Sequence, residues 1–387
     1  MIKLFKKTIC TCLIISLSIA LCSCSVNVKS DVFTKIGEEY DAVKDFSEGF
    51  AAVRNNGLWG FINTEGSQVI DYKYEQVWSF SEGLAAISQD NLWGFIDVQG
   101  NIVIEPQFDQ AWFFSGGLAA VKKGGFYGYI DNTGNVIVDF IYDDAGDFTD
   151  EITYVKSGKK YGFINKNGEV VSDFIWVEGR KASEGLVEVF DEYLSGFLDM
   201  SGNLAIPLSL PDAEYFTEGY APAKNEENKW GYIDTAGDFV IAPAWVAAGQ
   251  FSEGFAVVTD TITEDQDGTK YRKEYKGYIS KDGSVLVSPK YSYAYDFSCG
   301  RARVTTNALS GWKYIDTTGA EVLSTSYSEA RDFHENYAAV KSGEKWGLID
   351  LDGKLVIPVS WTSIGDVKDG CISLQKGNKY VFAKLNG

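Results

Sequence analysis

The chain has 387 residues, of which 45% are hydrophobic and 14% aromatic, and its formal net charge is -19. A surface this acidic repels phosphate backbones, so we expect no nucleic acid among its partners. The apolar content is ample for a large buried core.

The first residues have the pattern of an export signal. A basic start precedes the apolar run Ile9 to Leu21, which is shorter than the stretch of about 20 residues that a membrane span needs. The run ends in Leu21-Cys22-Ser23-Cys24, which resembles the lipobox of bacterial lipoproteins. Ordinary secretion and an uncleaved anchor are the alternatives.

That resemblance implies that residues 1–23 are a signal peptide and that Cys24 carries a lipid. Residues 24–30 would then form a short tether. The mature protein is thus expected outside the cytoplasm of a bacterium, as a lipoprotein held on a membrane of the cell envelope.

Beyond the tether, one short motif recurs along the chain. Its reference copy is Trp93-Gly94-Phe95-Ile96-Asp97-Val98-Gln99-Gly100, and successive copies lie 34 to 36 residues apart, with one interval of 46. The copies open with Trp59-Gly60, Trp93-Gly94, Tyr127-Gly128, Tyr161-Gly162, Ser195-Gly196, Trp230-Gly231, Lys276-Gly277, Trp312-Lys313 and Trp346-Gly347. An eroded copy follows at Lys379-Tyr380-Val381-Phe382. A fixed period in this range is typical of a repeat architecture.

Each repeat predicts three short strands and no helix. In the reference copy they cover residues 83–87, 92–97 and 101–104, which are rich in β-branched and aromatic residues. The last two are separated by Asp97-x-x-Gly100. An acidic or amide side chain there bonds the turn it opens, and glycine accepts a positive φ, so this spacing predicts a tight antiparallel hairpin.

A second marker, Phe80-Ser81-Glu82-Gly83, precedes the first strand and also recurs in each unit. Its third position carries an acid in many copies: Glu48, Glu82, Asp150, Glu184, Glu218, Glu253, Glu335 and Asp369. Such a stripe of acids is a possible site for cations or basic segments. We expect instead that each carboxylate accepts hydrogen bonds from the backbone of its own turn.

The repeats resemble the WG-repeat family of bacterial proteins, whose units carry Trp-Gly-[Phe/Tyr/Leu]-Ile-Asp-x-x-Gly and then a Pro-x-Tyr/Phe-like tail. That tail reads Glu105-Pro106-Gln107-Phe108 here. The sequence departs from the family at Ser195, Lys276 and Lys313. The resemblance implies an all-β repeat domain that is often exported, without a shared reaction or shared catalytic residues.

For residues 31–387 we predict an open, twisted or superhelical β array of about ten units with one continuous core. A closed propeller-like ring is the alternative. Propellers close with about 4 to 8 blades of four strands each, whereas this chain has more units than that and three recognisable strands in each.

Little in the chain indicates chemistry. The lone histidine, His334, has no second histidine or thiolate pair beside it, so neither a zinc site nor a histidine-based triad has its parts. No polar cluster departs from the repeat pattern. We therefore expect a protein that is not an enzyme and that needs no cofactor or metal.

The long interval places an insertion at residues 259–272, which predicts a hairpin that lengthens existing strands. Its Asp265-x-Asp267-Gly268 is similar to a calcium loop but lacks the bidentate Glu. We interpret Asp265, Asp267, Tyr271 and Arg272 as candidate partner contacts, with neutral drift of a loop as the alternative.

The function predicted from the sequence is that of a membrane-tethered, non-catalytic scaffold that binds an envelope or extracellular protein. A module that binds carbohydrate or cell wall through exposed aromatic residues is the alternative, and a hydrolase is the third. Rows of exposed rings favour sugar, whereas aromatic ladders buried in the core favour the scaffold.

Overall fold

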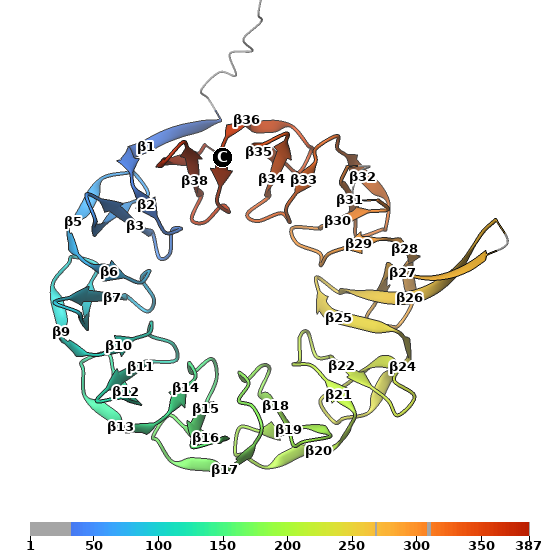
Figure 1. The fold of residues 1–387 in the computed structure, drawn as a ribbon, viewed down its shortest axis with the longest axis horizontal. Coiled ribbons are helices and arrows are strands. Elements are labelled where there is room, and N and C mark those ends of the chain that lie inside the picture. Colours follow the sequence, from blue (N-terminus) through green and yellow to red (C-terminus); the bar gives the residue numbers. More distant parts are fainter. Residues whose placement is uncertain (1–31, 268, 308–310, 387) are drawn as a thin grey trace, which may run out of the picture.

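The computed structural model describes residues 32–267, 269–307 and 311–386, and every regular element in those ranges is a β-strand. The strands form ten antiparallel sheets, nine of four strands and one of three. The sheets stand side by side as the blades of a ring around a central axis (Figure 1).

From the inner strand outward, the first four blades in chain order contain these strands. They are β2 (Ala42–Val43), β3 (Phe50–Asn55), β4 (Leu58–Asn63) and β5 (Gln68–Tyr74); β6 (Gln76–Val77), β7 (Leu84–Gln89), β8 (Leu92–Asp97) and β9 (Ile102–Phe108); β10 (Gln110–Ala111), β11 (Leu118–Lys123), β12 (Phe126–Asp131) and β13 (Val136–Tyr142); and β14 (Asp144–Ala145), β15 (Ile152–Ser157), β16 (Lys160–Asn165) and β17 (Val170–Trp176).

The next three blades are, in the same order, β18 (Leu186–Phe190), β19 (Ser195–Asp199) and β20 (Leu204–Leu210); β21 (Asp212–Ala213), β22 (Ala221–Lys224), β23 (Trp230–Ile233) and β24 (Phe239–Trp245); and β25 (Ala247–Ser252), β26 (Phe255–Gln266), β27 (Thr269–Ser280) and β28 (Val285–Tyr291).

The last three blades are β29 (Tyr293–Ala294), β30 (Arg301–Thr305), β31 (Lys313–Asp316) and β32 (Glu321–Ser324); β33 (Glu329–Ala330), β34 (Tyr337–Ser342), β35 (Lys345–Asp350) and β36 (Leu355–Trp361); and β37 (Ser363–Ile364), β38 (Cys371–Lys376), β39 (Lys379–Leu385) and β1 (Phe33–Tyr40).

The ring is closed because the first strand of the chain completes the last blade. β1 pairs antiparallel with β39, with Phe33 opposite Leu385 and Ile36 opposite Phe382. The backbone N–H of Asn386 also donates to the carbonyl of Val32 at 2.9 Å. The prediction of an open superhelical array is therefore wrong, and the chain forms a closed ring of ten blades.

Two features hid this closure from the sequence. Most blades have an inner strand of only two residues, which is too short to leave a periodic pattern in the sequence. The sequence of a unit therefore indicates three strands although the blade has four. The pairing of β1 with β39 joins the two ends of the described chain, and no local signal encodes it.

The core lies between neighbouring blades, in ten clusters of buried apolar residues. In the eight markers that have it, the Phe packs against an aromatic ring from the third strand of the preceding blade. Phe80 lies 4.9 Å from Phe61 between ring centroids, and Phe114 lies 4.8 Å from Phe95. These tilted or edge-to-face contacts add to area burial and fix each blade against the next.

The glycine of Trp-Gly is required by a close approach of the third and fourth strands. A Cβ on Gly60 would lie 2.5 Å from the carbonyl oxygen of Ile70, and the pairing shifts register on both sides of Phe61. Where Lys313 replaces this glycine, β31 and β32 keep their register from Lys313 to Tyr314, and the outer strand ends early at Ser324. The glycine therefore makes a bulge that extends the outer strand.

The Asp-x-x-Gly turns have the predicted geometry. Gly100 and Gly134 have φ values of 81° and 90°. The Asp97 carboxylate accepts hydrogen bonds from the backbone N–H groups of Gln99 and Asn101, both at 2.9 Å. This confirms the hairpin prediction in which glycine supplies the positive φ.

The marker acids bond a neighbouring blade, and of the eight only Asp150 also accepts a hydrogen bond from the backbone of its own turn, from Glu151 at 2.9 Å, which corrects the sequence-based expectation. The Glu48 carboxylate accepts from the N–H groups of Glu82 at 2.7 Å and Gly83 at 3.0 Å. The seven other marker acids reach the following marker in the same way. The expectation failed because neighbouring blades place equivalent marker turns side by side. The sequence of a single unit carries no information about this contact between blades.

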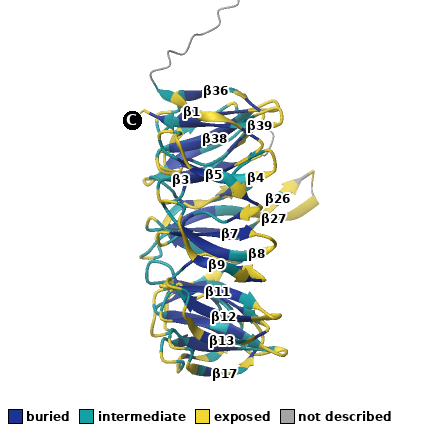
Figure 2. Ribbon diagram, turned by 90° about the vertical axis from the view of Figure 1, so that its left-hand side faces the viewer, coloured by how far each residue is buried: buried dark blue, intermediate teal, exposed yellow. Residues whose placement is uncertain are grey.

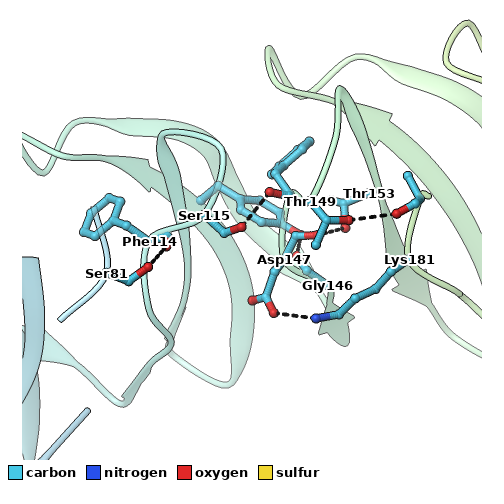
Figure 3. Close-up of polar contacts among 11 residues, drawn as sticks. Ser81, Phe114, Ser115, Gly146, Asp147, Thr149, Thr153 and Lys181 are labelled. Atoms are coloured by element: carbon cyan, nitrogen blue, oxygen red, sulfur yellow. Dashed lines mark hydrogen bonds and ion pairs between the residues drawn. The ribbon is translucent and has the colours of Figure 1, made fainter. Parts of the chain in front are cut away.

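The marker hydroxyls form a second set of bonds between blades. The Ser81 hydroxyl donates to the carbonyl of Phe114 at 2.8 Å, and Ser115 repeats this bond one blade further on (Figure 3). The marker turns thus act as a hydrogen-bonded belt, and most marker acids and hydroxyls are used by the fold.

Candidate functional site

The two faces of the ring differ in their connections. The third strand runs opposite to the second and the fourth, so the hairpins between the second and third strands lie on one face and the Asp-x-x-Gly turns on the other. We call the first the hairpin face. The edge view in Figure 2 shows exposed residues concentrated in the connections and buried residues in the strands between them.

One position on the inner side of each blade varies widely among the blades. It lies two residues before the marker aromatic, and we call it the inner-edge position. Its occupants are Lys44, Trp78, Trp112, Gly146, Arg180, Glu214, Gly249, Tyr295, Arg331 and Gly365. In most blades its backbone N–H donates to the second strand, as from Trp78 to Ala86 at 2.9 Å. The fold therefore fixes its backbone while its side chain is free to differ.

Two tryptophans occupy this position in successive blades. The ring centroids of Trp78 and Trp112 lie 5.6 Å apart with a tilt of 34°. The Trp78 indole N–H donates to the carbonyl of Ala111 at 3.1 Å, and Lys44 Nζ lies 4.5 Å from the Trp78 ring centroid. Trp112 is 37% exposed, and the next blade has Gly146 at the equivalent position. The stack therefore ends at Trp112, without a side chain to continue it.

The two tryptophans border a hollow on the hairpin face of about 370 Å³. Its lining is Gln76, Trp78, Ser88, Asn91, Trp93, Asp109, Gln110, Ala111 and Trp112. Two further hollows also reach Trp78, one toward Lys44 and Asp369 and one toward Phe113. Trp78 is thus the point where three depressions of the inner edge meet.

A polar cluster that sequence reasoning missed surrounds Glu188. This side chain is 2% exposed; Arg180 Nη1 donates to its carboxylate at 2.6 Å and the Ser195 hydroxyl at 3.4 Å. Burial raises the pKa of Glu188 to about 7, against the opposing effect of the Arg180 guanidinium. The expectation that no polar cluster departs from the repeat pattern is therefore wrong.

A signal for this cluster was present in the sequence. Equivalent positions in the first blades hold Ala52, Ala86 and Ala120, all buried, so an acid at 188 had to be buried and paired. Arg180 as its partner had no such signal, because it occupies the variable inner-edge position.

The Glu188 cluster borders a hollow of about 170 Å³ that also includes Asp212. A glycosidase needs two carboxylates that flank the bond to be cleaved. Here Glu188 is paired with Arg180, and Asp212 lies 3.4 Å from Lys224 Nζ. Both carboxylates already have cationic partners, so this geometry is better explained as an ion-paired support for the blade.

The candidate partner contacts lie on a projecting arm. β26 and β27 pair without interruption from Phe255 opposite Ser280 to Gln266 opposite Thr269. The arm extends beyond the outer margin of the ring (Figure 1). Asp265 and Arg272 lie in its strands, Asp267 lies in its turn with φ 53°, and Tyr271 is 52% exposed.

The aromatic residues that open the motifs pack mainly within the ring. Tyr127 and Trp346 are buried, and Trp59, Trp93, Tyr161 and Trp230 are half-buried. By the criterion set from the sequence, these rings are core ladders. The exposed Trp112 stands apart from them.

The predicted lipid site, Cys24, lies outside the described residues, as do the signal peptide and the tether. In the described ranges no helix is long and apolar enough to cross a membrane. In the same ranges, no three or more His, Cys, Asp or Glu residues lie together in an arrangement that could hold a metal ion.

A closed ring of ten antiparallel sheets, with its first strand in its last sheet, is a ten-bladed β-propeller. The chain belongs to the family of the WG containing repeat. The family model matches residues 39–59, 59–93, 93–125, 127–161, 161–190, 196–230, 230–260, 277–309, 312–346 and 346–380.

The structure is also similar to solved propellers. The WD40 domain of SCAP from fission yeast is 9% identical with a TM-score of 0.35, over 92% of this chain and 94% of that one. The Pan2 WD40 domain of Neurospora crassa is 11% identical with a TM-score of 0.30, over 92% and 96%. At that similarity neither structure indicates what this protein binds. No curated protein matches the sequence.

Proposed function

We propose that this propeller is a non-catalytic binding scaffold of the bacterial cell envelope, tethered by a lipid on Cys24, that holds a partner protein through the β26–β27 arm. The observation that carries the proposal is the arm itself. Among the strands in the described part of the chain, β26 and β27 alone reach twelve residues.

The two sides of the arm differ in chemistry. Alternation along paired strands places Ile262, Tyr271 and Tyr275 on one side, because Glu264 pairs with Tyr271 and Asp260 pairs with Tyr275. Ile262 is 40% exposed. The other side carries Thr263 opposite Arg272 and Asp265 opposite Lys270. The first side therefore carries Ile262 and the two tyrosines together with Asp260, Glu264 and Lys273, and the other side carries no aromatic residue.

Exposed isoleucine and tyrosine side chains on a projection add little to the core of the ring, and exposed aromatic residues are the usual anchors of protein interfaces. Charged residues on both sides keep the arm soluble, and the cross-strand pairs hold its register. We infer that the partner contacts the side with Ile262 and Tyr271, and that Asp265 and Arg272 keep the arm straight.

The tether limits how far from the membrane the ring can bind its partner. Nine residue steps separate Cys24 from Phe33 (33 - 24), and an extended chain of that length spans at most about 32 Å. A lipid on Cys24 therefore keeps the blade that contains β1 close to the membrane surface.

The test is site-specific photocrosslinking in intact cells, with the photoreactive residue at position 271 in one strain and at position 263 in the other. The two positions lie on opposite sides of the same arm and serve as matched controls. We expect a discrete adduct with a protein from position 271 and a much weaker one from position 263. Equal adducts, or none at 271, would remove the arm as the partner contact.

A further inference from the structure

The hollow between Trp78 and Trp112 does not belong to the arm, and its chemistry is that of a small-molecule site. Its volume of about 370 Å³ falls in the range of about 300–1,000 Å³ that is usual for such sites. It lies between the second and third blades, whereas the arm extends from the blade of β25 to β28.

Three tryptophans line the hollow: Trp78, Trp93 and Trp112. Lys44 precedes Trp78 around the ring and Trp112 follows it, so the two faces of the Trp78 indole are both in use. One face of Trp112 meets Trp78, and beyond the other the inner-edge position is Gly146. A Cβ at Gly146 would lie 2.5 Å from the Tyr154 ring, so this position has no room for a side chain that would cover Trp112.

The rim of the hollow is polar and nearly uncharged. It presents the amides of Gln76, Asn91 and Gln110, and Asp109 is its only ionisable group. The Tyr127 hydroxyl donates to the Gln110 side-chain oxygen at 2.6 Å, which fixes the orientation of that amide. Amides both donate and accept hydrogen bonds, and a carboxylate accepts them.

These features select among ligand classes. A phosphate or carboxylate ligand would meet Asp109 and a chain with net charge -19. A purely apolar ligand would bury the rim amides without partners, which is costly. A pyranose ring has an apolar C–H face that packs flat on an indole, and hydroxyl groups around its edge that match amides and a carboxylate.

We propose that this hollow binds a neutral sugar residue of a glycan, with the sugar ring packed against the indoles of Trp93 and Trp112 that line the hollow and its hydroxyls bonded to Gln76, Gln110 and Asp109. This binding is independent of the arm, so the protein would hold a glycan and a partner protein at separate places on the hairpin face.

The experiment uses the full ring without its signal peptide and three neutral probes: cellohexaose, maltohexaose and the hexamer of N-acetylglucosamine. Binding is measured by saturation-transfer NMR and titration calorimetry. We expect at least one probe to bind, and Trp112→Ala to weaken it about tenfold or more, which is the scale of one aromatic contact. Trp112→Phe, which keeps a flat ring, should restore part of the affinity.

The matched control is Tyr293→Ala, which removes an aromatic residue of similar exposure from the inner strand of another blade. It should leave the affinity within about twofold, as should removal of the arm. Thermal melting and circular dichroism confirm that each variant is folded. No binding of any probe to the unaltered ring, or equal affinity in Trp112→Ala, would overturn the proposal.

Discussion

The Asp369 carboxylate accepts a hydrogen bond from the backbone N–H of Gly49 at 2.9 Å, although 320 residues separate them in the chain. This bond is equivalent to the one from Gly83 to Glu48, so the belt of marker turns continues across the junction of the last and first units. This carboxylate bond makes the closing junction resemble most of the other junctions between blades. The junction between the last and first blades therefore uses the same kind of side-chain bond, while β1 supplies the strand that completes the last blade.

Deleting residues 32–40 tests how far the ring depends on its closing strand. The change removes the buried side chains of Ile36 and Tyr40 and leaves the edge of β39 unpaired. We expect the free energy of unfolding to fall by about 3 kcal/mol or more, from the lost apolar burial. Chemical denaturation measures the loss, and small-angle scattering detects opening or association through the free edge.

The control is deletion of residues 24–31, which precede β1, and it should leave the unfolding curve unchanged. If the two deletions give the same stability, the Asp369 to Gly49 junction holds the ring without β1, and the assigned role of β1 is wrong.

Gly94→Ala tests the close approach of the third and fourth strands. A Cβ at this position would lie 2.6 Å from the backbone nitrogen of Pro106, so the strands must move apart. We expect a loss of about 1–3 kcal/mol, as for other overpacked sites. Gly249→Ala is the matched control, because there the nearest atom to a new Cβ, the Val257 oxygen, is 3.5 Å away.

The readout for both glycine variants is the midpoint of urea unfolding. Equal midpoints would mean that the bulge tolerates a side chain, and Lys313 would then be an ordinary substitution. A lower midpoint for Gly94→Ala alone supports the packing argument.

Glu188 predicts a pH dependence of stability. Its ordinary pKa near 4.5 rises to about 7 in the folded ring, so between these values the folded state holds a proton that the unfolded chain has released. Its contribution to stability is therefore fully present below about pH 4.5, falls as the pH rises to 7, and is constant above. The full effect is at most about 3 kcal/mol.

Glu188→Gln removes this titration while it keeps the size of the side chain, and Arg180 remains partly exposed to water. We expect the variant to gain stability relative to the original chain between pH 5 and pH 7.5, measured by urea unfolding at both values. All other acids titrate in the same way in both proteins, so the difference between their stabilities at the two pH values reports the titration of Glu188 alone. Parallel pH profiles would show that Arg180 holds this carboxylate ionised throughout.

Cys24→Ala tests the membrane tether. Without the thiol no lipid can be attached, so we expect the precursor to accumulate and the protein to leave the membrane fraction. Fractionation with immunoblotting and mass spectrometry of the mature N-terminus measure both effects. Ser23→Ala, which keeps a small residue before the cysteine, should process normally. Full membrane association of Cys24→Ala would contradict the lipobox interpretation.

The sequence by itself determined the repeat unit, its strands and its turns. Each of these depends on contacts between near neighbours, such as Asp97 with the backbone of Asn101, so a period and a few residue types suffice to predict them. The phases of the aromatic residues likewise indicated core ladders, because stacked copies place equal residues together.

Only the tertiary structure decided closure and the site. Whether ten units form an array or a ring depends on the small rotation between blades and on the pairing of β1 with β39, and neither has a local signature. The Trp78–Trp112 hollow and the Arg180–Glu188 pair arise where variable positions of one blade meet the next. These contacts depend on how neighbouring blades pack, and the sequence of one unit does not specify that packing.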